Sequence, residues 1–98
     1  MQDNYGVYYY PQPENTRLKM YVRVSEGVVE FRPAHADNAK LWEEHGWIPY
    51  EAAKKADEYS REQGRRYPLH LYDFDVALGV LSDSNPEAVA AARRTNES

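Results

Sequence analysis

The sequence predicts a small α+β domain, in which an antiparallel or mixed sheet, made of an N-terminal hairpin and a third strand, packs against two to four helices. Three observations predict this class. Apolar and polar residues alternate over residues 18–24, and runs of helix-forming residues follow from residue 36, separated by glycines and prolines. The length of 98 residues leaves room for one hydrophobic core.

Residues 1–16 are predicted to form a flexible leader, because Asp, Asn, Gly and Pro interrupt any sustained period. Within it, residues 7–10 have high β propensity, so a short strand or docking of their rings on the core is the alternative. The domain itself is assigned to residues 17–94, and residues 95–98 to a disordered tail. We therefore expect removal of residues 1–13 to leave the fold intact.

Residues 18–24 read as a half-buried strand. One face carries Leu18, Met20, Val22 and Val24, and the other carries Arg17, Lys19, Tyr21 and Arg23. A short loop with Gly27, which accepts a positive φ, suits a tight hairpin turn. The return strand over residues 28–32 places Val29 and Phe31 inward, and Pro33 is expected to end it.

Two helices are predicted next. Residues 36–45 have a polar N-terminal cap and end at Gly46, which suits the position after a helix C-terminus. Pro49 is then well placed to open a second, amphipathic helix over residues 50–63, which ends at Gly64. Its apolar face is expected to carry Tyr50, Ala53, Ala56 and Tyr59.

The remaining third of the chain is less regular. Residues 67–72 alternate Leu with His and Tyr, which favours a third strand. Residues 73–81 fit a strand in part and a helix in part, and we favour a short helix capped by Asp73. Asn85 is the expected N-cap of a last helix over residues 85–94.

The inward and outward faces assigned to these strands and helices predict a hydrophobic core. The side chains expected to be largely buried are Met20, Val22, Phe31, Trp42, Leu69 and Leu71. Truncation of Phe31 or Trp42 to alanine is expected to cost about 3–5 kcal/mol.

Composition and motifs argue against an enzyme and predict no cofactor. The chain has no cysteine, which excludes disulfides, thiolate catalysis and thiolate zinc sites. His35, Asp37 and His45 lack metal-ligand spacing, so no metal site is expected. Asp73 and Asp75 resemble a phosphatase Asp-x-Asp nucleophile only in spacing, and helix capping explains both.

We expect a cytoplasmic location and no contact with a membrane, because the sequence has neither a signal-like N-terminus nor an apolar run of about 18 residues. A secreted protein whose signal peptide has been removed is the alternative.

Two surfaces are candidate partner sites. One is the tyrosine cluster of Tyr5, Tyr8, Tyr9 and Tyr10, of which residues 8–10 are the candidate site residues, since tyrosine is enriched at protein interfaces. The other is the outward hairpin face, on which cations could meet phosphates while a ring stacks on a base; it carries Arg17, Lys19, Tyr21, Arg23 and Arg32. The net charge of −4 weighs against nucleic acid.

The leading hypothesis is therefore a non-enzymatic protein-interaction or regulatory module. Self-association through an exposed strand edge or the tyrosine cluster is one form of it. The alternative is a small nucleic-acid-binding module that uses the basic and aromatic face of the hairpin.

Overall fold

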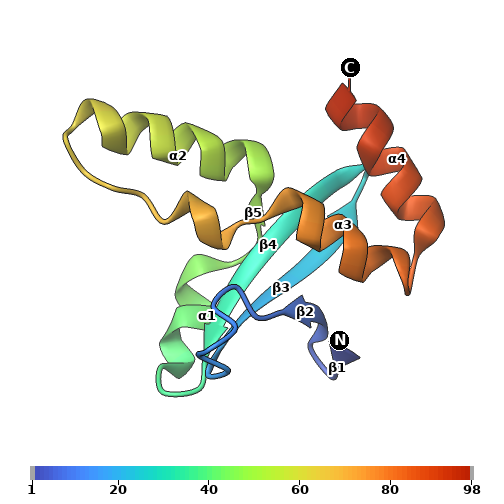
Figure 1. The fold of residues 1–98 in the computed structure, drawn as a ribbon, viewed down its shortest axis with the longest axis horizontal. Coiled ribbons are helices and arrows are strands. Elements are labelled where there is room, and N and C mark those ends of the chain that lie inside the picture. Colours follow the sequence, from blue (N-terminus) through green and yellow to red (C-terminus); the bar gives the residue numbers. More distant parts are fainter. Residues whose placement is uncertain (1, 98) are drawn as a thin grey trace.

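A computed structural model describes residues 2–97 of the chain, and the side chains of residues 2–92. Five strands form one antiparallel sheet in which each strand pairs with the next along the chain (Figure 1). They are β1 (Gln2–Asp3), β2 (Gly6–Tyr9), β3 (Leu18–Ser25), β4 (Val28–His35) and β5 (Ile48–Pro49). The helices are α1 (Ala39–His45), α2 (Tyr50–Glu62), the 3₁₀ turn η1 (Leu69–Leu71), α3 (Phe74–Ser82) and α4 (Pro86–Glu97). The predicted α+β class is confirmed.

The β3–β4 hairpin is the centre of the sheet, as predicted. Ser25 pairs with Val28 across a two-residue turn, in which Glu26 and Gly27 have φ values of 52° and 78°. Positive φ at both positions matches the twist of the flanking strands. The prediction that Pro33 ends the second strand is wrong, because β4 continues to His35.

Pro33 fits within β4 because of its register. It lies opposite Met20, and counting pairs from the turn places it at a position that makes no hydrogen bond to β3. The N–H that proline lacks is therefore not needed in this ladder.

The N-terminal residues belong to the sheet instead of forming an irregular leader. Tyr9 of β2 pairs with Met20 of β3 and is only 5% exposed. Its hydroxyl donates to the Leu71 carbonyl at 2.5 Å and accepts the Asp73 N–H at 2.9 Å, so it ties β2 to the start of α3. The prediction of a leader over residues 1–16 is wrong for β1 and β2, and the strand alternative is confirmed for residues 7–9 but not for Tyr10.

The four α-helices lie in the predicted segments, although α1 begins at Ala39 and not at residue 36, and its N-cap Asn38 makes no side-chain capping hydrogen bond. The ambiguous segment 73–81 is the helix α3, and the Asp73 carboxylate accepts the Val76 N–H at 3.1 Å as its N-cap. Asn85 caps α4 in the same way through the Ala88 N–H, at 3.2 Å. The helix α4 runs to Glu97, so residues 95–97 continue the helix where a disordered tail was predicted. Ser98 lies outside the described residues.

The predicted third strand over residues 67–72 is wrong. Leu69–Leu71 form a 3₁₀ turn, and the N–H of Tyr72, which follows it, donates to the Leu69 carbonyl at 2.9 Å. The edge of β4 at residues 30–31 is already taken by the short strand β5. Both leucines instead pack against the core as partly buried residues.

The core lies between one face of the sheet and the helices α2, α3 and α4. Met20, Val22 and Phe31 are buried as predicted, whereas Leu69, Leu71 and Trp42 are only half-buried. The two leucines lie at the margin of the core, and Trp42 lies on the opposite face of the sheet. The remaining buried apolar residues on this side include Val29, Ala53, Tyr72, Ala77, Leu78, Leu81, Val89 and Ala92.

The buried face of α2 also differs from the prediction. Ala53 and Asp57 are buried, whereas Tyr59 is 64% exposed. Only the first half of this helix lies against the sheet, so its far end projects beyond the domain core (Figure 1). None of the described helices is both long enough and apolar enough to cross a membrane.

Candidate functional site: an aromatic hollow on the outer sheet face

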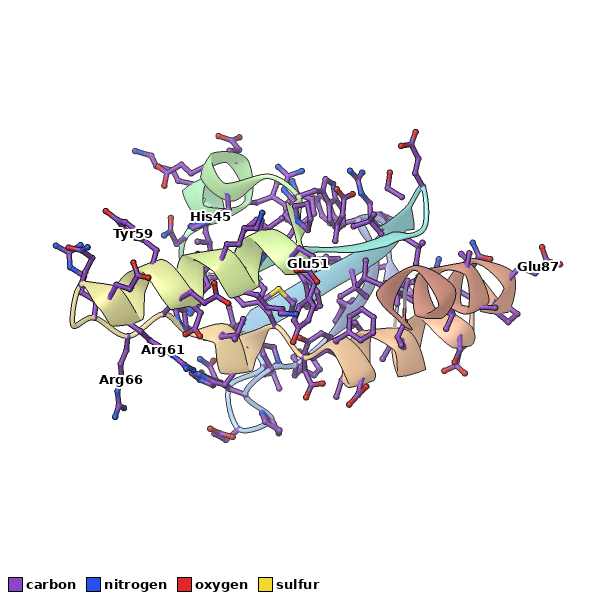
Figure 2. All side chains as sticks on the ribbon, turned by 90° about the horizontal axis from the view of Figure 1, so that it is seen from above. His45, Glu51, Tyr59, Arg61, Arg66 and Glu87 are labelled. Atoms are coloured by element: carbon purple, nitrogen blue, oxygen red, sulfur yellow. The ribbon has the colours of Figure 1, made fainter. Side chains whose placement is uncertain are left out.

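The second face of the sheet, which we call the outer face, carries aromatic rings and α1. Figure 2 shows α1, marked by His45, on one side of the sheet and α4, marked by Glu87, on the other. Alternation along the strands turns Tyr8 and Tyr21 to this face, while Tyr9 and Met20 point to the core. The rings in edge or tilted contact here are Tyr5, Tyr8, Tyr21, Trp42 and Trp47.

Cations of the hairpin lie over several of these rings. Lys19 lies 4.6 Å from the ring centre of Tyr8, and Arg23 lies 4.3 Å from that of Trp47. Arg32 lies 3.9 Å from the ring centre of Trp42 and also donates two hydrogen bonds to the Trp42 carbonyl, at 2.6 and 2.8 Å. Through these cation–π contacts, the cations stabilise the packing of α1 and of the rings on the sheet.

The same cations have acidic partners. Arg17 pairs with Asp37 at 2.6 Å, and Arg23 pairs with Glu30 at 2.6 Å. Lys19 pairs with Asp3 at 3.4 Å. The hairpin face is therefore not a row of free positive charges, although each exposed pair is weak in water.

Tyr21 lies beneath this face, not on its surface. It is 3% exposed, and its hydroxyl donates to the Asp3 carboxylate at 2.5 Å. Burial and this hydrogen bond raise the pKa of Tyr21 well above its ordinary value of 10.0. For Asp3, burial alone would raise the pKa, but the hydrogen bonds from Tyr21, the Tyr5 N–H and Lys19 outweigh it and lower the pKa below 3.8.

Stability is expected to decline at alkaline pH because of these tyrosines. Burial also raises the pKa of Tyr9, to about 12. A raised folded-state pKa contributes stability that is complete below the unfolded value of about 10 and is lost as the pH rises above it. Urea unfolding at pH 8, 10 and 11 should show this loss. Tyr21→Phe should make the loss above pH 10 shallower, and an unchanged profile would contradict the assignment.

Between these rings and the start of α1 lies a hollow of about 710 Å³, which we call the aromatic hollow. Its lining residues are Tyr5, Tyr10, Thr16, Arg17, Lys19, Tyr21, Ala34, His35, Ala36, Asn38, Ala39, Trp42 and Glu43. Its volume is in the range of ligand sites, about 300–1,000 Å³.

The structure brings together half of the predicted site residues. Four of them line the aromatic hollow: Tyr10, Arg17, Lys19 and Tyr21. Tyr8 adjoins it through the ring of Tyr10, with centroids 5.6 Å apart. Arg23 and Arg32 lie over the two tryptophans, and Tyr9 is in the core on the opposite face.

Among the rings of the hollow, sequence reasoning missed Trp42, whereas Tyr5 belonged to the tyrosine cluster that it predicted as a partner site. Trp42 was assigned to the core because, with Leu41, it was placed on the apolar side of its helix. The available signal was the narrow apolar face of this helix, which has only two large apolar residues among seven. Tyr5 lies in the two-residue turn between β1 and β2, and sequence periodicity does not report its contact with Trp42.

Comparison with known protein families, characterised proteins and solved structures gave no match. Residues of the hollow must therefore be interpreted from their own chemistry. Within the described part of the chain, no three His, Asp or Glu side chains converge as a metal site would require. His35 instead accepts the Asp37 N–H through Nδ1 at 3.0 Å.

Proposed function

We propose that this protein is a non-enzymatic interaction module that binds an extended segment of another protein in the aromatic hollow. The observation that carries the proposal is Tyr5, which is 66% exposed at the edge of the hollow. Its ring packs edge-on against Trp42 at 5.4 Å and Tyr21 at 6.1 Å. A large ring that is already held in place loses little conformational entropy when a partner covers it.

A proline-containing segment in the extended polyproline II conformation fits this surface best. Such segments bind grooves lined by aromatic rings, because the segment is already extended before it binds. Tyr5, Tyr10 and Trp42 supply the rings, while Thr16 and Asn38 supply polar groups. The cations beside them are paired with carboxylates, which favours a segment of low charge over a polyanion.

Other forms of the interaction hypothesis have less support. Both edge strands, β1 and β5, have two residues, and β5 includes Pro49, which lacks a donor for a further strand. Nucleic-acid binding by base stacking would need the ring of Tyr21, which is covered. We therefore place the partner at the hollow and not at a strand edge.

A display selection of proline-containing peptides against the full chain tests the proposal. Tyr5→Ala should weaken binding of selected peptides at least about tenfold, since buried aromatic anchors dominate interface energies. Tyr59→Ala is the matched control, because Tyr59 is equally exposed but lies on α2 outside the hollow. Affinities can be measured by isothermal titration calorimetry.

Two results would contradict the proposal. One is a selection that yields no peptide competing for the aromatic hollow. The other is a set of peptides whose affinity changes equally in the Tyr5 and Tyr59 variants, since that would place binding elsewhere.

A further inference from the structure

A second hollow, of about 910 Å³, lies between α2 and the segment that leads from it into α3, and we call it the arginine hollow. It shares no lining residue with the aromatic hollow, so a ligand site here is independent of the proposed function. Its lining residues are Tyr50, Asp57, Arg61, Arg65, Arg66, Tyr67, Pro68, Leu69, His70, Tyr72, Asp73, Phe74 and Asp75.

Two adjacent arginines of this hollow have side chains without partners among the described residues. Arg61 pairs with Asp57 at 3.1 Å, whereas Arg65 and Arg66 are exposed and make no ion pair with any described side chain. Figure 2 shows Arg61 and Arg66 extending to the same side of the far end of α2, opposite to Tyr59. Arginine binds phosphate through paired N–H donors, so two free guanidinium groups favour a phosphate.

The wall of the hollow is aromatic. The rings of Tyr67 and Tyr72 are stacked, with centroids 5.9 Å apart and planes 11° apart. Tyr72 is buried, whereas Tyr67 is only half-buried and lines the hollow. Tyr50 and Phe74 continue the wall, with centroids 5.2 Å apart. A planar ligand can stack on such a surface.

The carboxylates that also line the hollow limit which ligand fits. Asp57 is paired with Arg61, and Asp73 accepts the Val76 N–H as the N-cap of α3. Asp75, in the first turn of α3, is exposed and lines the same hollow as Arg65 and Arg66. Because the hollow carries both arginines and carboxylates, we expect it to bind an inorganic anion only weakly at physiological salt. A ligand with an aromatic ring would gain further affinity by stacking on the aromatic wall.

We propose that the arginine hollow binds a phosphate monoester carried on an aromatic ring system, with Arg65 and Arg66 at the phosphate and Tyr67 against the ring. Two ligand sources share this chemistry. In one the ring is the base of a mononucleotide, and in the other it is a phosphorylated phenol such as phosphotyrosine.

Titration of the full chain with adenosine monophosphate, phenyl phosphate and inorganic phosphate, followed by NMR, tests the site. At least one aromatic ester should bind about tenfold or more tightly than inorganic phosphate and shift the Tyr67 signals. The double substitution Arg65→Gln and Arg66→Gln should weaken that binding at least about tenfold. Arg17→Gln, in the aromatic hollow, is the control and should leave it unchanged.

The comparison of esters identifies the source, and either one supports the proposal. Preference for adenosine monophosphate indicates a nucleotide, and preference for phenyl phosphate indicates a phosphorylated phenol. The proposal is overturned if neither ester binds at millimolar concentration in low salt. It is equally overturned if inorganic phosphate binds as tightly as both esters, or if the double substitution leaves binding unchanged in a protein that remains folded.

Discussion

Phe31→Ala is expected to lower the free energy of unfolding by about 3–5 kcal/mol, the cost of removing a fully buried ring. Phe31 is 0% exposed and lies between the rings of Tyr50 and Tyr72, at 5.9 and 5.6 Å. It also pairs with Val22 of β3 and Ile48 of β5. Its loss would therefore open a cavity where the sheet, α2 and the start of α3 meet.

Urea denaturation followed by far-UV circular dichroism can measure this loss. Domains of this size have a total stability of about 5–15 kcal/mol, so the variant should be partly unfolded at elevated temperature. Val28→Ala is the matched control, because Val28 lies on the same strand but is exposed beside the turn, where substitutions change stability by about 0.5 kcal/mol. A loss below about 1 kcal/mol for Phe31→Ala would contradict the assigned core.

Removal of residues 1–13 is expected to lower the thermal midpoint by more than about 12 °C. This reverses the expectation drawn from sequence alone. The deletion removes β2 and the buried ring of Tyr9, and it leaves the Leu71 carbonyl and the Asp73 N–H without their partner. Loss of such a ring costs about 3 kcal/mol or more, and each kcal/mol lowers the midpoint by about 4–8 °C in a domain of this size.

Differential scanning calorimetry of the truncated and full chains measures the shift. Tyr9→Phe removes the hydroxyl and its two hydrogen bonds but keeps the buried ring. This variant therefore measures the contribution of the hydrogen bonds alone, and it should lower the midpoint by less than the deletion does. Tyr10→Ala is the control, since its ring lies on the outer face beside Tyr8 and has no place in the core. A truncated chain that melts within about 4 °C of the full chain would show that β2 contributes little.

The candidate site was only partly predictable, because periodicity reports which face a residue is on but not what covers that face. The outward direction of Lys19, Tyr21 and Arg23 follows from their alternation with Met20 and Val22. In the structure these three side chains lie on the outer face. That alternation says nothing of Trp42, which packs at 5.1 Å from Tyr21 and covers it. The exposed ring on this face is Tyr5 instead.

The local chemistry of the chain determined most of the secondary structure. The β3–β4 hairpin follows from strict alternation and a turn with Gly27, and the starts of α3 and α4 follow from Asp73 and Asn85, whose side chains accept N–H groups of the first turn. These interactions lie within a few residues of one another. They depend on backbone geometry and capping, which short stretches of sequence encode.

Only the tertiary structure decided which segments join the sheet. Residues 67–72 have a strand pattern, but Leu69–Leu71 form η1, and β5 is the strand that pairs with β4 at residues 30 and 31. Residues 6–9 have a weak pattern but form β2, because the other edge of β3 is open and Tyr9 finds partners at residues 71 and 73. Strand pairing depends on an available edge and on contacts distant in sequence, and neither is encoded in the segment itself.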